Sequence, residues 1–142
     1  MLFLDTEFDA YRGPLISLAL ISDIDGHEFY GVLQPPPNPH PWVAEHVIPL
    51  LNRAPEPEAE FRLRLAIYLQ RHVGEPIVAD WPEDFIHLLA MITSPGGERV
   101  RVDFDMKLVS GMNTNPVLPH NALSDAKALM HAWRLMNLRG RG

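Results

Sequence analysis

The chain has 142 residues, of which 46% are hydrophobic and 21% are charged, and its formal net charge is −6. This is the usual size of one domain with one hydrophobic core, so we expect residues 1–142 to form a single domain. The absence of cysteine excludes disulfides, thiolate zinc sites and cysteine nucleophiles, and it is compatible with the cytoplasmic location that we expect. The negative charge argues against a protein that coats duplex nucleic acid nonspecifically.

The sequence predicts no targeting or membrane segment. Acidic residues occur within Met1–Asp9, where a signal peptide would need a basic region followed by an apolar run. No stretch approaches the ~20 apolar residues that cross a bilayer. We therefore expect no membrane partner.

The first third of the chain predicts three strands. Apolar runs at 1–8 and 15–21 suit buried strands, and Asp25-Gly26 is a hairpin signal before a third strand at 28–33. Short hairpin connections favour antiparallel pairing, so these strands should form a meander. A loop with five prolines follows, at 34–41.

Helices and strands then alternate. Pro49 should limit a helix at 42–51 to a short or distorted one. The remaining predicted elements are a helix at 58–72, a strand at 76–81, a helix from Pro82 to 92, a half-exposed strand at 100–106, a final helix capped by Asn121 and ending near 138, and a frayed tail at 139–142. This order predicts an α/β fold with a mixed five-stranded sheet and helices on its faces.

Two acidic residues end the first predicted strand in the pattern Asp5-x-Glu7. Side chains two residues apart on a strand point to the same face, so both carboxylates can reach one cluster of hard cations. A solvated strand end is the alternative, because short patterns of this kind are common. Thr6, between them, should face the other way.

A histidine and an acid flank the start of the predicted final helix, as His120 and Asp125 in the pattern H-x₄-D. Asp125 could simply interact with the helix dipole, and His120 could be an ordinary loop residue. The combination of this motif with Asp5-x-Glu7 favours a shared site.

A third acidic segment lies between these motifs, where a buried strand runs directly into a helix. Asp84 is our candidate for a third acid next to Asp5, and Asp80 is the alternative. Glu83 and Asp84 could also be only the acidic residues that favour a helix start.

The order D-x-E, a lone D at a helix start, and H-x₄-D resembles the DEDDh 3′→5′ exonucleases, which have an RNase H-like fold. Within that family the chain is similar to the small bacterial and phage exoribonucleases typified by mycobacterial RNase AS. Two segments carry this second likeness: Asp5-Thr6-Glu7-Phe8 and Trp42-Val43-Ala44-Glu45-His46-Val47-Ile48-Pro49. The resemblance extends from Asp5 to about Met136. The middle motif departs from the family, because it lacks an Asn shortly before the acid.

The resemblance implies a fold, a cofactor and a role for each site residue. It implies an RNase H-like fold and two Mg²⁺ ions, for which Mn²⁺ could substitute. Asp5 would bridge the ions, Glu7 and Asp125 would complete the first site, and Asp84 would act on the second. His120 would take the proton from the attacking water.

The resemblance also implies the substrate and the assembly. It implies release of nucleoside monophosphates from single-stranded nucleic acid, with RNA favoured over DNA, and a homodimer. Thr6 and Phe8, next to the acids, are candidate substrate contacts, although Phe8 suits the core equally well. The alternatives are an RNase H-like endonuclease and a non-catalytic module that binds nucleic acid or protein. Four other histidines have no partner motif and are expected to be structural or at the surface: His27, His40, His72 and His131.

Overall fold

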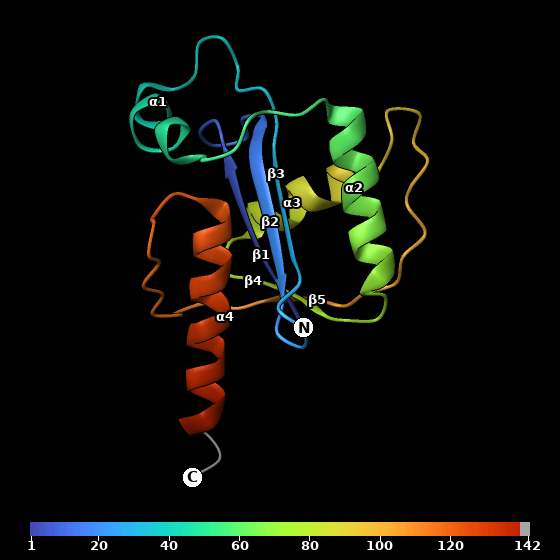
Figure 1. Ribbon diagram of the computed structural model, residues 1–142, viewed down its shortest axis with the longest axis vertical. Helices are drawn as coiled ribbons and strands as arrows, with labels where there is room; N and C mark the ends of the chain where they lie inside the picture. Colours follow the sequence, from blue (N-terminus) through green and yellow to red (C-terminus); the bar gives the residue numbers. More distant parts are fainter. Residues whose placement is uncertain (140–142) are drawn as a thin grey trace.

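The computed structural model describes residues 1–139 and has one five-stranded sheet with helices on both faces (Figure 1). The elements are β1 (Leu2–Phe8), β2 (Leu15–Ser22), β3 (Glu28–Val32), α1 (Pro41–His46), the 3₁₀ helix η1 (Ile48–Leu50), α2 (Glu58–Arg71), β4 (Ile77–Ala79), α3 (Pro82–Met91), β5 (Met106–Leu108) and α4 (Ala122–Arg139). The predicted α/β class and the order of helices and strands are confirmed.

The sheet is mixed and has the strand order β3-β2-β1-β4-β5. The first three strands pair antiparallel, as the hairpin signal predicted, whereas β4 and β5 join parallel to β1. Because β1 and β4 run in the same direction, their carboxyl ends meet at one edge of the sheet. This edge is where Asp5 and Glu7 leave β1 and where α3 follows β4.

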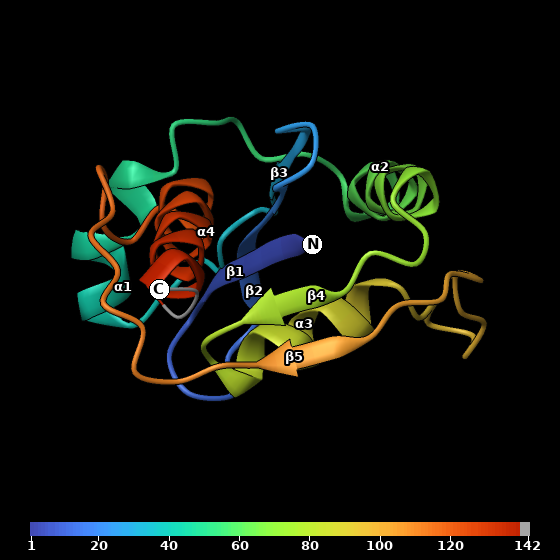
Figure 2. The same ribbon diagram turned by 90° about the horizontal axis from the view of Figure 1, so that it is seen from below.

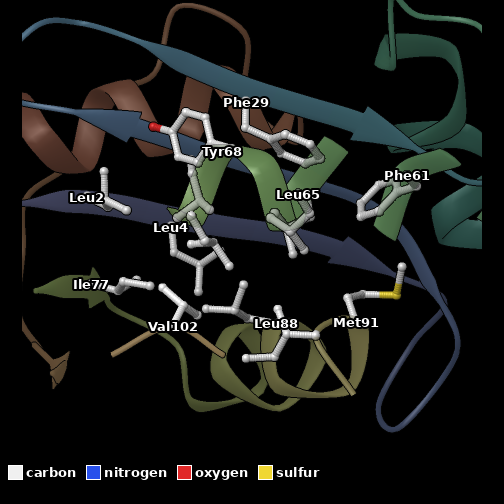
Figure 3. Close-up of a cluster of buried hydrophobic side chains, with 14 of the residues drawn as sticks. Leu2, Leu4, Phe29, Phe61, Leu65, Tyr68, Ile77, Leu88, Met91 and Val102 are labelled. Carbon is white, nitrogen blue, oxygen red and sulfur yellow. The ribbon is translucent and has the colours of Figure 1, made fainter. Parts of the chain in front are cut away.

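Alternate side chains of β1 face two different helix layers. Leu2 and Leu4 belong to a core that α2 and α3 cover, shown in Figure 3, whereas Phe3 packs beneath α4 with Ala126 and Leu129. Figure 2 shows α4 and α2 on either side of β1. By the same alternation, Thr6 faces α3, and Asp5 and Glu7 face α4.

The predicted strand at 100–106 is wrong in its position, because β5 begins only at Met106. Val102 and Phe104 do point inward and pack against the core, which explains the alternating pattern. The backbone here is not part of a strand: the Asp103 carbonyl accepts from the Gly74 N–H, and Val100 N–H donates to Ile92. The alternation of apolar and charged residues at 100–106 therefore reflects which side chains are buried and does not indicate a paired strand.

Other boundaries differ from prediction by a few residues. Pro49 does split the segment after the proline loop into a short α1 and η1. Asn121 caps α4, since its Oδ1 accepts from the Ser124 N–H at 3.1 Å. Arg139 ends α4, and the rest of the tail predicted to fray lies outside the described residues. Within residues 1–139, no helix is both long and apolar enough to span a membrane.

We expect Gly31→Ala to destabilise the protein. A methyl group at Gly31 of β3 would overlap the ring of Phe61, which is fully buried on α2. Overpacking of this kind costs about 1–3 kcal/mol, which urea denaturation can measure. Gly96→Ala is the control, because the nearest atom to its new methyl group is Ser94 Oγ at 3.8 Å. Equal stability of the two variants would contradict the packing described here.

Candidate metal centre

The structure brings five carboxylates together at the carboxyl ends of β1 and β4. They form two groups that each offer three ligand atoms within 4.8 Å of one another: Asp5, Glu7 and Asp125 in the first, and Asp5, Asp80 and Asp84 in the second. Asp5 belongs to both groups. Asp80 and Asp84, which sequence reasoning treated as alternatives, therefore lie beside Asp5 together.

Each carboxylate is positioned by a different part of the fold. β1 directs Asp5 and Glu7 toward α4, where Asp125 lies in the first turn. β4 leads through Asp80 into α3, where Pro82 occupies the first turn and sets the helical backbone angle. Asp84 follows in that first turn, so both helix starts point acidic side chains at the same edge of the sheet.

Asp84 is held by the strand residue that separates Asp5 from Glu7. Its Oδ1 accepts from the Thr6 backbone N–H at 3.1 Å and from the Thr6 hydroxyl at 2.7 Å. Its Oδ2 is buried and has no hydrogen-bond partner among residues 1–139, and the same is true of Asp5 Oδ2. Leaving a buried polar atom unpaired is costly, so these two oxygens are suited to a ligand that the protein atoms do not supply.

The site strongly favours protonated carboxyls in the absence of a cation. Burial raises the pKa of Asp5 well above its ordinary value, and repulsion from Asp84 and Glu7 adds to this effect. Burial and repulsion from Asp125 raise the pKa of Glu7 to about 8. Burial also raises the pKa of Asp84 to about 7, although the Thr6 hydroxyl lowers it. A divalent cation would offset both the cost of burying these charged carboxylates and the repulsion between them.

The chemistry of the donor set fits hard divalent cations. All candidate ligands are carboxylates, which Mg²⁺ and Mn²⁺ prefer, and no nitrogen or sulfur ligand lies in either group. The orphaned oxygens of Asp5 and Asp84 are available as ligands. The residues present therefore fit the two-cation site that the family resemblance implies.

His120 lies beside Asp125 but outside both carboxylate groups. Its backbone N–H donates to Asp125 Oδ2 at 3.0 Å, and its backbone has a left-handed φ of 65°. Its ring makes a T-shaped contact with the Trp42 ring, with centroids 5.0 Å apart and planes at 82°. Sequence reasoning did not anticipate this contact, because nothing in the spacing of Trp42 on α1 indicates it.

Asn121 fixes the loop that carries His120 against the segment after α1. Its Nδ2 donates to the Leu50 carbonyl at 2.8 Å, while Tyr30 on β3 donates its hydroxyl to the Leu51 carbonyl. The Asn121 side chain therefore caps α4 and also links the loop that carries His120 to the segment that contains Leu50.

The candidate substrate contacts have partners within the protein. Thr6 is buried and its hydroxyl donates to Asp84. The Phe8 ring is partly buried and lies 4.8 Å from the His87 ring between centroids. Contact of either residue with substrate stays a prediction.

Exposed aromatic and basic side chains lie near the start of α3, the helix that carries Asp84. Trp81 is 58% exposed and Tyr11 is 76% exposed, and the Arg12 guanidinium lies 5.1 Å from the centroid of the Tyr11 ring. Glu83 connects Trp81 to the segment that carries Tyr11 and Arg12, because its carboxylate accepts from the Arg12 backbone N–H and from Trp81 Nε1. Sequence reasoning missed this patch, since Glu83 looked like a helix-start acid.

Comparison with known proteins adds no assignment. No family model matches the chain, and no curated protein matches it.

The raised pKa values predict how the stability of the metal-free protein depends on pH. Folded Glu7 and Asp84 keep protons that the unfolded chain releases near pH ~4, so the free energy of unfolding should fall as the pH rises from about 5 to about 8. Saturating Mg²⁺ should remove most of this fall, because it binds the ionised carboxylates. Melting temperatures with and without Mg²⁺ test this expectation.

Two variants make that measurement specific. Glu7→Gln should weaken the dependence of the melting temperature on pH, because an amide does not ionise and only the contributions of Asp84 and Asp5 remain. Glu45→Gln, at an exposed position of α1, should keep the native dependence. A metal-free protein that becomes more stable over this range would contradict the assignment.

Proposed function

We propose that this protein is a two-metal-ion 3′→5′ exonuclease with an RNase H-like fold. The observation that carries the proposal is that Asp5 belongs to two carboxylate groups at once, as a ligand shared by two cations would. The mixed sheet, with three antiparallel strands and helices on both faces, supports the fold assignment.

The carboxylates divide between two cation sites. Asp5, Glu7 and Asp125 would hold one ion, and Asp5, Asp80 and Asp84 the other. When bound, the two ions would neutralise charge on the scissile phosphate and make water more acidic. Thr6 would keep Asp84 Oδ1 fixed, which leaves Oδ2 free as a ligand.

His120 is the proposed general base. Its backbone bond to Asp125 places it beside the first carboxylate group, yet its imidazole is not among the ligands. A neutral imidazole there can accept the proton of the attacking water. The Trp42 ring limits the orientations open to the imidazole.

The surface around the acids suits a single strand. Exposed Trp81 and Tyr11 offer faces on which unpaired bases can stack, and Arg12 can pair with phosphate. The preference for RNA over DNA rests on the family resemblance.

A digestion panel tests the proposal. 5′-labelled single-stranded RNA, single-stranded DNA and duplexes are each incubated with Mg²⁺ or Mn²⁺. We expect a ladder of products shortened from the 3′ end and release of nucleoside monophosphates, with single-stranded RNA degraded fastest.

Circular single-stranded RNA of the same sequence is the matched control. An exonuclease leaves it intact, whereas an RNase H-like endonuclease cuts internally. Binding of linear RNA without any cleavage would instead indicate a non-catalytic module, and either result would overturn the proposal.

A further inference from the structure

A second cluster of potential metal ligands lies at the opposite end of β1 from the acidic site. The β2–β3 turn carries Asp25 and His27, and His72 directly follows α2. Strand register places this turn beside the start of β1, since Leu2 pairs with Ser22. In Figure 1 the turn lies next to the N label, at the lower end of the sheet.

The two histidines, expected to be structural or at the surface, point ring nitrogens at each other. His27 Nδ1 lies 2.9 Å from His72 Nε2, and His72 is only 5% exposed. Asp25 completes the cluster, with ligand atoms of all three residues within 4.8 Å of one another. Its Oδ1 also accepts from the His27 backbone N–H at 2.9 Å, which keeps the carboxylate beside the rings.

Hydrogen bonding sets the tautomer of His72. Its Nδ1 lies 2.7 Å from Glu75 Oε1, and Glu75 Oε2 accepts from the Ser22 hydroxyl at 3.2 Å. The carboxylate favours a proton on Nδ1, which leaves a lone pair on Nε2 directed at His27. Carboxylate–histidine pairs of this kind orient ligands around zinc.

We propose that His27 Nδ1, His72 Nε2 and the Asp25 carboxylate bind one Zn²⁺ ion, with water as the fourth ligand. Two imidazole nitrogens and one carboxylate suit Zn²⁺ rather than Mg²⁺, which requires oxygen ligands. Zn–N bonds of about 2.0–2.1 Å in a tetrahedral site separate two nitrogens by about 3.3 Å, so the rings need to move apart only slightly. Arg71, 3.6 Å from Asp25, is the cation that Zn²⁺ must displace.

Zinc at this position would join the β2–β3 turn to the end of α2. Both segments lie at the surface, and the Tyr68 hydroxyl already links them by donating to the His27 carbonyl at 2.8 Å. The expected effect is a higher melting temperature with Zn²⁺. The site does not depend on the proposed nuclease activity, because none of its residues belongs to the acidic groups.

Equilibrium dialysis against ZnCl₂ tests the site, in an Asp5→Asn background that disables the acidic centre. We expect one bound Zn²⁺ per chain, and Co²⁺ in its place should give the intense visible absorption of four-coordinate cobalt. His27→Gln and Asp25→Asn should each lose the bound ion and the absorption. His131→Gln, which replaces an exposed histidine on α4, should retain both.

Circular dichroism verifies that each variant is folded. If His27→Gln does not fold, Asp25→Asn alone tests the site, because Asp25 lies in an exposed turn where the substitution should not disturb the fold. Unchanged zinc binding in a folded His27→Gln or Asp25→Asn variant would overturn the proposal. So would a parent protein that binds no Zn²⁺, since His27 and His72 would then only share a hydrogen bond.

Discussion

Asp5→Asn is expected to reduce nuclease activity to background and to raise the melting temperature of the metal-free protein. The loss of activity follows because Asp5 is the residue shared by the two carboxylate groups that could each hold a cation. The gain in stability follows because burial and repulsion from four neighbouring acids disfavour the ionised form of Asp5, and these acids are Asp84, Glu7, Asp125 and Asp80. An asparagine keeps the shape of the side chain without the charge.

Three measurements separate these effects: cleavage of labelled single-stranded RNA, Mg²⁺ binding by calorimetry, and thermal melting in EDTA. Asp103→Asn is the matched control, since this exposed acid lies outside the site and should leave all three unchanged. Native activity in the Asp5→Asn variant would refute the metal-centre assignment. A lower melting temperature in EDTA would show that the charge of Asp5 is stabilising.

His120→Ala is expected to lower the single-turnover rate about 10²–10⁴-fold, the usual contribution of a general base, with little change in Mg²⁺ affinity. The affinity should persist because the imidazole is not among the ligand atoms of either group.

A second variant guards against a structural explanation. The φ of 65° at position 120 is strained for alanine, whereas asparagine tolerates it, so His120→Asn should fold as the native protein does and show the same kinetic loss. His131→Ala is the control for removing a histidine. Loss of Mg²⁺ binding in both His120 variants would make His120 a ligand, and native turnover would make it an ordinary loop residue.

Local rules were sufficient for the parts of the site that lie on single elements. Alternation along a strand predicted that Asp5 and Glu7 share a face, and the structure places both toward α4. Capping chemistry predicted where α4 begins, which placed Asp125 in its first turn. Both inferences depend on residues a few positions apart, where backbone geometry alone determines direction.

Contacts between distant segments could not be predicted in this way. The start of a helix is enough to explain both Glu83 and Asp84, so the sequence does not distinguish their roles. Only the packing of α3 against β1 shows that Asp84 contacts Thr6 while Glu83 contacts Arg12. The contact of the Trp42 ring with the His120 ring depends on where α1 lies relative to the loop before α4, which local patterns do not determine. The contact between His27 and His72 could not be predicted either, because no sequence motif relates the two residues.

The site draws its ligands from both ends of the described chain, and this has a consequence for translation. A growing polypeptide contains Asp5 and Glu7 well before Asp125, which is added only with α4, after the other elements in residues 1–139. Proteins emerge from the ribosome with the amino terminus first, so an unfinished chain would hold an incomplete ligand set. Under the proposed function, nuclease competence would therefore arise only after the start of α4 has been synthesised and has packed against β1.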